Sequence, residues 1–281
     1  MRRNTSEAVR FQIGFSIQSL MTHFMKATIL CLYDEGAVEG TPLIGARGFS
    51  LLINVDGEQT MFDTGLRGRY LMNNMKVLKV VPEKIKRVII SHGHSDHVGG
   101  LRKLNDSRTE YLKVFSDQKT FETRTGIRGS PVFKGLTKIA HEHVEGWVRL
   151  SEHLYIAPPI SGEHSECSAV LLTKRGPVLI CGCCHDGIGQ RMDQVEDMLG
   201  RQPTSIVGGL HLSGSGHQRI GRTLEDLESR GSPHIYTGHC TEPNGMTKLR
   251  TRFGLRAVSD LYAGTEIRFD LSHENSKNNG L

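Results

Sequence analysis

The sequence predicts a layered fold of the mixed α/β (α+β) class, because short apolar runs typical of strands are interspersed with amphipathic helical patterns. In the second half of the chain, a strand that ends in polar residues is repeatedly followed by a helix. Strand-end turns of this kind gather on one edge of a sheet, where layered α/β proteins bind ligands and metals. The pattern therefore predicts a functional site at a sheet edge.

The expected elements cover most of the chain. Apolar runs rich in β-branched residues predict strands at residues 27–32, 49–55, 59–62, 87–91, 112–115, 154–156, 169–173, 177–181, 205–208 and 234–236. Between the second and third of these, Asp56-Gly57 favours a hairpin turn. Apolar residues recur at three- and four-residue spacing at 189–199, 218–228 and 244–252, which predicts helices there.

Length and composition fit one globular catalytic domain. The 281 residues are 37% hydrophobic and 23% charged, as in ordinary globular proteins. No apolar run approaches the roughly eighteen residues that a membrane span needs. The formal charge of +5 comes from scattered Lys and Arg, which favours an anionic small molecule and argues against nucleic acid as a partner. A homodimer is compatible with the sequence.

The six cysteines do not form the disulfide framework of a short secreted protein. Three of them, Cys181, Cys183 and Cys184, crowd into four positions. A reducing cytoplasm is the expected location. Cys181 and Cys184 are expected to pack in the core as small apolar side chains.

The ends of the chain are expected to lie outside the catalytic domain. Residues 1–24 lack a small-residue cleavage signal and form a poor signal peptide, so we interpret them as a dispensable extension. The domain is expected to span residues 25–272. Residues 273–281 are polar and are expected to form a disordered tail.

A dense group of metal-binding side chains follows the apolar run Val88-Ile89-Ile90. His92, His94, Asp96 and His97 stand within six residues of one another, and imidazole and carboxylate are ligands that divalent zinc, iron and manganese accept. His92 and His94 alternate along an extended turn, so they suit one ion. Asp96 and His97 are better directed at a second ion.

Five motifs resemble, in order, those of the metallo-β-lactamase superfamily. They are Phe62-Asp63-Thr64-Gly65, the His92-Gly93-His94-Ser95-Asp96-His97 string, Gly182-Cys183-Cys184-His185, Gly208-Gly209-Leu210-His211-Leu212 and Thr237-Gly238-His239-Cys240-Thr241. The resemblance covers roughly residues 26–269 and is strongest to the branch of dihydropterin-ribofuranosylaminobenzene-phosphate synthase-like hydrolases. It implies a four-layer αββα sandwich.

The resemblance also implies ligand roles. His239 matches the closing ligand of the second ion, and Asp63 is expected to accept a ring N–H and fix a histidine tautomer. The third ligand of the first ion stays open between His164, Glu166 and His185.

A departure from the superfamily stands at the position that bridges the two ions. Most hydrolytic members have Asp there, whereas this chain has Cys183. A thiolate binds zinc but orients water differently from a carboxylate. One ion or two are therefore both compatible with the sequence, and zinc is expected, with iron or manganese as alternatives.

The chemistry implied is hydrolysis by a metal-activated water, with Asp96 as a proton acceptor. The expected substrate is a small anionic phosphoester, lactone or amide, and the branch name suggests a pterin-like compound. His211 and, in a lid-like segment at 115–147, Arg124 and Arg128 are candidate substrate contacts; Trp147 lies in the same segment. His211 is equally compatible with a half-buried structural role, and the segment with an exposed excursion.

Two other functions compete with this hypothesis. A nuclease or phosphodiesterase acting on nucleic acid would need a basic groove or a clamping insertion, for which the chain has little room. An iron-binding redox, transfer or sensor protein of the same fold is the other alternative, and Cys183 is the main argument for it.

Overall fold

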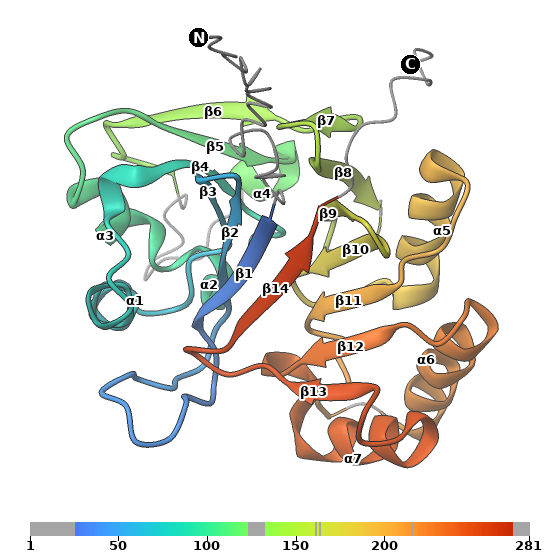
Figure 1. Cartoon of the computed structure of the whole chain (residues 1–281). Coiled ribbons are helices and arrows are strands. Elements are labelled where there is room, and N and C mark those ends of the chain that lie inside the picture. Colours follow the sequence, from blue (N-terminus) through green and yellow to red (C-terminus); the bar gives the residue numbers. More distant parts are fainter. Residues whose placement is uncertain (1–25, 123–132, 161, 163, 215, 272–281) are drawn as a thin grey trace, which may run out of the picture.

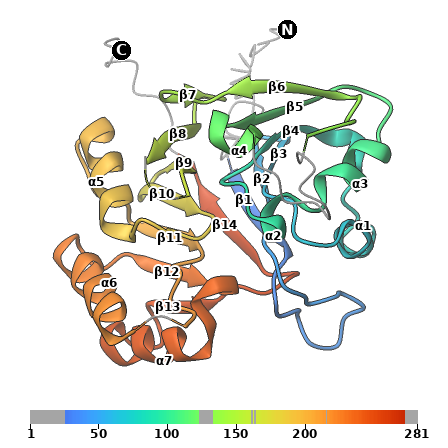
Figure 2. The ribbon, with the colours of Figure 1, turned by 180° about the vertical axis from the view of Figure 1, so that it is seen from behind.

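The computed structural model describes residues 26–122, 133–160, 162, 164–214 and 216–271. Across these residues, two seven-stranded sheets lie face to face, with helices on the outer face of each (Figures 1 and 2). The predicted αββα sandwich is confirmed.

The first sheet contains the N-terminal strands and the last strand, in the order β14-β1-β2-β3-β4-β5-β6. Its strands are β1 (Lys26–Tyr33), β2 (Ser50–Val55), β3 (Glu58–Phe62), β4 (Ile85–Ile89), β5 (Leu112–Ser116), β6 (Ile139–His143) and β14 (Glu266–Asp270). The hairpin between β2 and β3 turns at Asp56 and Gly57, both with positive φ, as the dipeptide predicts.

The second sheet has the order β13-β12-β11-β10-β9-β8-β7. Its strands are β7 (Val148–Arg149), β8 (Leu154–Ile160), β9 (Glu166–Thr173), β10 (Gly176–Cys181), β11 (Ser205–Gly208), β12 (His234–Thr237) and β13 (Val258–Asp260). Strands β10 to β13 run parallel, and β10 is buried along its whole length, as expected for a strand covered on both faces.

The helices form the two outer layers. On the side of the first sheet they are α1 (Gly68–Val77), α2 (Ser95–Val98), α3 (Leu101–Asp106) and α4 (Gln118–Glu122), and on the side of the second they are α5 (Ile188–Leu199), α6 (His217–Ser229) and α7 (Glu242–Phe253). Two short 3₁₀ turns lie at Pro82–Lys84 and His239–Thr241. Among the described helices, none is long and apolar enough to span a bilayer.

Three buried apolar clusters correspond to the three interfaces of the sandwich. One lies between the sheets and includes Phe62, Ile89 and Ile180. A second joins the other sheet to α5–α7, and a third joins the first sheet to α1 and α3. Cys181 and Cys184 belong to the second cluster, which confirms their predicted burial.

Every strand and helix expected from the sequence is present, with small differences at the boundaries. The apolar patterns of the sequence do not predict β6, β7, β13, β14 or the helices before α5. The reason for the missed strands is that β7 and β13 are short and that β6 and β14 are edge strands with polar residues, so they carry little apolar periodicity. The predicted terminal segments at 1–24 and 273–281 lie outside the described residues.

The strand directions bring the motif-bearing ends to one edge of the sandwich. β3, β4 and β5 are parallel to one another, as are β10, β11 and β12. Asp63, the histidine string, Cys183, His211 and His239 each follow the C-terminal end of one of these strands. The fold therefore collects residues from both sheets at the seam between them.

Truncation of the inter-sheet core should destabilise the protein strongly. Ile180 is fully buried in that core, so Ile180→Ala should lower the free energy of unfolding by roughly 2–5 kcal/mol. Val81→Ala, at a position that is 44% exposed, is the matched control and should change it by less than about 0.5 kcal/mol. Denaturant unfolding measures both variants, and equal effects would contradict the assigned core.

Candidate metal centre

The first group of converging donors contains three histidines. Nitrogen atoms of His92, His94 and His185 lie within 4.8 Å of one another, and His92 Nε2 is 3.1 Å from His94 Nδ1. His92 and His94 come from the turn after β4, and His185 comes from the turn after β10. The group therefore spans the two sheets.

His185 provides a test of whether this group suits a metal ion. Its Nδ1 lies 3.1 Å from Glu166 Oε2, whereas its buried Nε2 has no hydrogen-bond partner in the described part of the chain. Buried polar atoms are rarely left without a partner. A ring held through one nitrogen with the other nitrogen open is typical of a metal-binding histidine, so the donor set fits a divalent ion.

The second group contains Asp96, His97 and His239, whose donor atoms also lie within 4.8 Å of one another. His97 Nε2 and His239 Nε2 are 3.2 Å apart. Two facing ring nitrogens can share one proton or direct both lone pairs at one cation. This group also combines the two sheets, because His239 follows β12.

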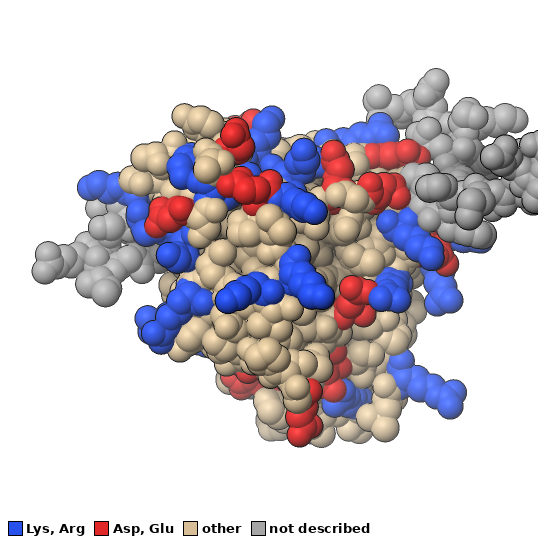
Figure 3. Space-filling view, turned by 60° about the vertical axis from the view of Figure 1, so that its left-hand side comes forward, with Lys and Arg blue, Asp and Glu red and all other residues tan. Residues whose placement is uncertain are grey.

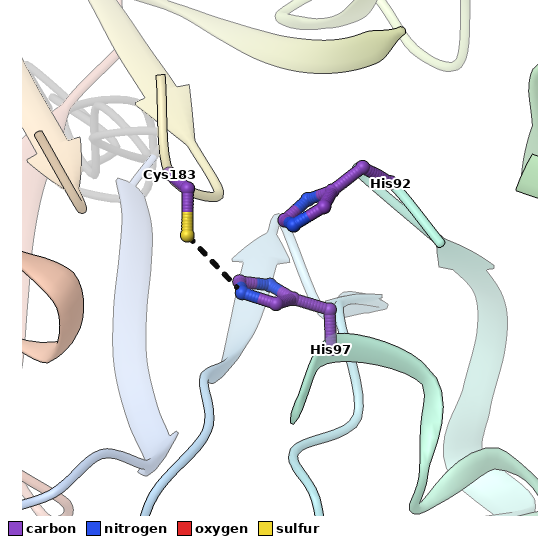
Figure 4. Close-up of side chains that lie close together, drawn as sticks. All are labelled: His92, His97 and Cys183. Carbon is purple, nitrogen blue, oxygen red and sulfur yellow. Dashed lines mark hydrogen bonds between the residues drawn. The ribbon is translucent and has the colours of Figure 1, made fainter. Parts of the chain in front are cut away.

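Cys183 lies between the two groups. Its Sγ is 3.3 Å from His97 Nε2, and Figure 4 shows the thiol directed at that ring beside His92. The same sulfur lies within 4.8 Å of donor atoms of His92 and His97, and also of His185 and His211. It therefore stands at the central position that the sequence resemblance implies for a bridging residue.

A buried carboxylate organises the histidine string. Asp63 accepts hydrogen bonds from the Ser91 N–H at 2.8 Å and the Ser91 hydroxyl at 2.7 Å. Its Oδ2 lies 2.6 Å from His97 Nδ1. Because this contact occupies Nδ1 of His97, the Nε2 lone pair is left to face the site. Asp63 therefore lies within hydrogen-bond distance of a histidine ring, as a carboxylate that fixes a histidine tautomer would.

A second buried carboxylate, that of Glu166, organises the turn after β10. It accepts the backbone N–H groups of Cys183, Cys184 and His185 and pairs with the fully buried Arg191 at 3.3 Å. Burial would raise the pKa of Glu166, but Arg191 and His185 hold it well below the usual range. Both oxygens of Glu166 are therefore engaged, which separates this residue from the converging donors.

Burial lowers the pKa of several site histidines. It lowers the pKa of His92 well below the ordinary value, and it lowers the pKa of His94 and of His211 to about 4. His97 differs, because Asp63 raises its pKa against the effect of burial. Burial also opposes ionisation of Asp96, yet His97 and His239 keep the pKa of this carboxyl below its usual value. Neutral imidazoles and an ionised carboxylate are the forms that bind metals.

Left-handed backbone conformations concentrate around the site. Non-glycine residues with positive φ here include Asp63, Ser165, Cys184, His211 and His239. Such conformations cost of order 1–3 kcal/mol each and persist only where the surroundings enforce them. Hydrogen bonds to the buried carboxylates supply that enforcement for the turns after β3 and β10.

A cavity of about 360 Å³ opens over the donors. Its lining includes candidate site residues from the sequence and others that the sequence did not indicate. The lining residues are Glu35, Arg47, His94, Asp96, Cys183, His185, His211, Ser213, His239, Cys240 and Glu242. Arg47 Nε pairs with Asp96 Oδ2 at 3.1 Å, while 74% of the Arg47 side chain is exposed. The positively charged guanidinium of Arg47 therefore lies at the opening of the cavity.

Other predicted site residues are placed differently. The His164 ring lies 4.6 Å from that of His94 and 4.5 Å from that of His185, between centroids, but it belongs to none of the converging groups. Trp147 packs against the cluster beside α5 rather than over the cavity, because its large apolar ring is covered there. Arg124 and Arg128 lie outside the described residues.

Sequence reasoning missed Arg47, Glu35, Arg191 and Cys240. Arg47 and Glu35 lie in the connection between β1 and β2, which carries no motif. Arg191 is a charged residue within a helix, where exposure is the ordinary expectation. Cys240 could have been predicted from the sequence, because it directly follows the candidate ligand His239.

The fold and these motifs define a class of protein. The chain belongs to the metallo-β-lactamase superfamily, whose sequence model matches residues 44–184. Members of this superfamily are metal-dependent hydrolases or related enzymes, and the chain is an enzyme of this kind.

Individual relatives differ in what they act on. The chain is 25% identical over 283 residues to 7,8-dihydropterin-6-methyl-4-(beta-D-ribofuranosyl)-aminobenzene-5'-phosphate synthase of Methanocaldococcus jannaschii, covering 86% of this chain and 96% of the relative. It is 22% identical over 253 residues to exodeoxyribonuclease WalJ of Streptococcus pneumoniae, covering 80% and 90%. The expectation against a nucleic-acid partner is therefore not supported.

A solved structure agrees with the fold. Tm1679, a metal-dependent hydrolase of the β-lactamase superfamily, superposes with a TM-score of 0.71 at 24% identity, covering 88% of this chain and 99% of that one.

The low pKa of two site histidines can be measured directly. In the metal-free protein, His94 and His211 should stay neutral as the pH falls through 6.5 and should take up a proton only near pH 4, because burial disfavours the cation. Their ring-proton chemical shifts, followed by NMR across the acid range, give the midpoints. Midpoints near the unperturbed value of about 6.5 would contradict the described burial.

Proposed function

We propose that this protein is a metal-dependent hydrolase that cleaves a phosphoester bond in a small anionic substrate. The observation that carries the proposal is the arrangement of two converging donor groups with Cys183 between them. Members of both groups line one cavity, namely His94, His185, Asp96 and His239. A two-position centre of this kind is suited to the displacement chemistry of phosphoester hydrolysis.

The geometry supports a specific set of ligands. The first position is held by His92, His94 and His185, which favours His185 over His164 and Glu166. The second is held by Asp96, His97 and His239, with Cys183 shared between the positions. Imidazole and thiolate donors favour zinc, and the carboxylate also accommodates iron or manganese.

A metal ion held by these residues would supply water activation and polarisation of the scissile group. The protein's own residues prepare for that chemistry. Asp63 and Glu166 fix the rings of His97 and His185 through Nδ1, which leaves each Nε2 available. Asp96 remains ionised and paired with Arg47, so it serves as a ligand and as a short-range proton acceptor.

Substrate choice follows from the cavity. Its volume of about 360 Å³ is at the lower end of the usual range for small-molecule sites. Arg47 at the mouth is paired with Asp96, and Glu35 and Glu242 also line the cavity, so the bound ions would supply the positive charge that attracts an anionic group. His211 and Ser213 on the wall offer polar contacts. The M. jannaschii relative is named for a pterin-containing 5'-phosphate, which supports a phosphorylated ring compound as the substrate class.

A nuclease activity is the second candidate, favoured by the similarity to exodeoxyribonuclease WalJ. Figure 3 shows basic side chains distributed over one face of the molecule, with acidic ones among them. On this face the charges are mixed, whereas a continuous basic stripe tracks a nucleic-acid backbone. We therefore rank the small phosphoester first.

The test is a substrate screen with metal-loaded protein. Small phosphomonoesters and phosphodiesters, single-stranded DNA, a lactone and a β-lactam are compared. A small phosphoester should be hydrolysed, a chelator should abolish turnover, and added zinc should restore it. His94→Ala should lose both bound metal and activity, because removing a ligand opens the coordination sphere.

The matched control is His217→Ala, which removes an exposed imidazole on α6. It should retain metal and turnover. Unchanged metal content in His94→Ala would reject the ligand assignment, and DNA as the sole substrate would replace the proposed function by the nuclease.

A further inference from the structure

Cys240 brings a second sulfur to the metal centre. Its Sγ lies within 4.8 Å of Cys183 Sγ and of a ring nitrogen of His239. Cys240 is only 9% exposed, yet it lines the same cavity as Cys183 and His239. Free cysteines in this protein otherwise pack in apolar clusters, as Cys31, Cys167, Cys181 and Cys184 do.

We propose that Cys240 is a metal ligand, and that Cys183, His239 and Cys240 form a sulfur-rich donor set for a thiophilic divalent ion such as zinc, cadmium or cobalt. This set overlaps the harder set of Asp96, His97 and His239 through the shared histidine. The inference rests on the metal centre of the proposed function but not on its hydrolytic activity.

One backbone N–H is directed at the Cys240 sulfur. The His211 backbone N–H donates to Sγ across 3.2 Å. Sγ also lies 3.8 Å from the Cys183 carbonyl oxygen, to which a protonated thiol donates. A backbone N–H directed at sulfur stabilises a thiolate, as hydrogen bonds to metal-bound sulfur do.

The glycines before His211 make room for this sulfur. A Cβ at Gly209 would collide with Cys240 Sγ and with the Gly182 carbonyl oxygen. The absence of side chains at Gly208 and Gly209 thus allows the turns after β10, β11 and β12 to approach one another. A role for His211 alone would not require this glycine pair. The approach brings Cys183, His211 and Cys240 together.

The backbone at His239 is held in the conformation that directs the His239 imidazole and the Cys240 thiol toward the metal centre. Its φ is 36°, and its N–H donates to Asp34 Oδ2 at 3.0 Å. Asp34 is buried at the end of β1, so the contact ties the turn after β12 to the first sheet. The imidazole of His239 and the thiol of Cys240 are therefore positioned by the fold and not only by each other.

The second metal position therefore offers two alternative donor sets, Asp96-His97-His239 and Cys183-His239-Cys240, which suit different ions. Hard cations such as Mn²⁺ prefer the carboxylate of Asp96, whereas soft ones prefer the two sulfurs. Removing the Cys240 sulfur should therefore weaken binding of thiophilic ions and leave Mn²⁺ binding unaltered.

The first experiment is spectroscopic. Cobalt-loaded wild-type protein should show thiolate-to-cobalt charge-transfer absorption, which Cys183→Ser and Cys240→Ser should each reduce to about half and the double variant should abolish. Cys31→Ser, at a buried position in the inter-sheet core, is the control and should keep the full band. A wild-type band in Cys240→Ser would overturn the proposal.

A second experiment needs no variant. Alkylation of wild-type protein by iodoacetamide, read residue by residue by mass spectrometry, should modify Cys240 in the metal-free state. Saturating Cd²⁺ should protect it, whereas saturating Mn²⁺ should not. Equal protection by both ions, or by neither, would contradict ligation by Cys240. If no ion binds at all, the proposed metal-dependent function fails as well, so the two failures are distinguishable.

Discussion

The histidine string of the site depends on the buried carboxylate of Asp63, which directly follows β3. A buried carboxylate is costly unless hydrogen-bond donors surround it, and here Ser91 supplies two and His97 a third contact. These contacts fix the start of the histidine string relative to β3 and decide which nitrogen of His97 faces His239 and Cys183. The left-handed backbone of Asp63 is maintained by the same contacts.

Glu166 plays the corresponding part on the second sheet. It draws three successive backbone N–H groups of the turn after β10 around one carboxylate, and Arg191 balances its charge. Each sheet thus contributes one buried anion that shapes one donor-bearing turn. Cys183 lies where the two turns meet, which explains why its sulfur approaches donors of both groups.

Much of this arrangement was predictable from the sequence, because apolar runs locate the strands and the motifs stand at their ends. The convergence of His92, His94, Asp96 and His97 at one edge could be expected from their spacing. The convergence of His185, and not of His164, with His92 and His94 could not be predicted, because it depends on the turn that Glu166 organises through its contacts with His185. The role of Arg47 was equally inaccessible, since a long connection without a motif brings it to Asp96.

The most direct test of the account is the zinc affinity of Asp63→Asn, measured by competition with a chelator. Asn keeps the shape and tolerates the left-handed backbone, but its amide favours the wrong tautomer of His97. The account predicts a folded protein whose affinity falls by about 10- to 100-fold. Wild-type affinity in this variant would contradict it.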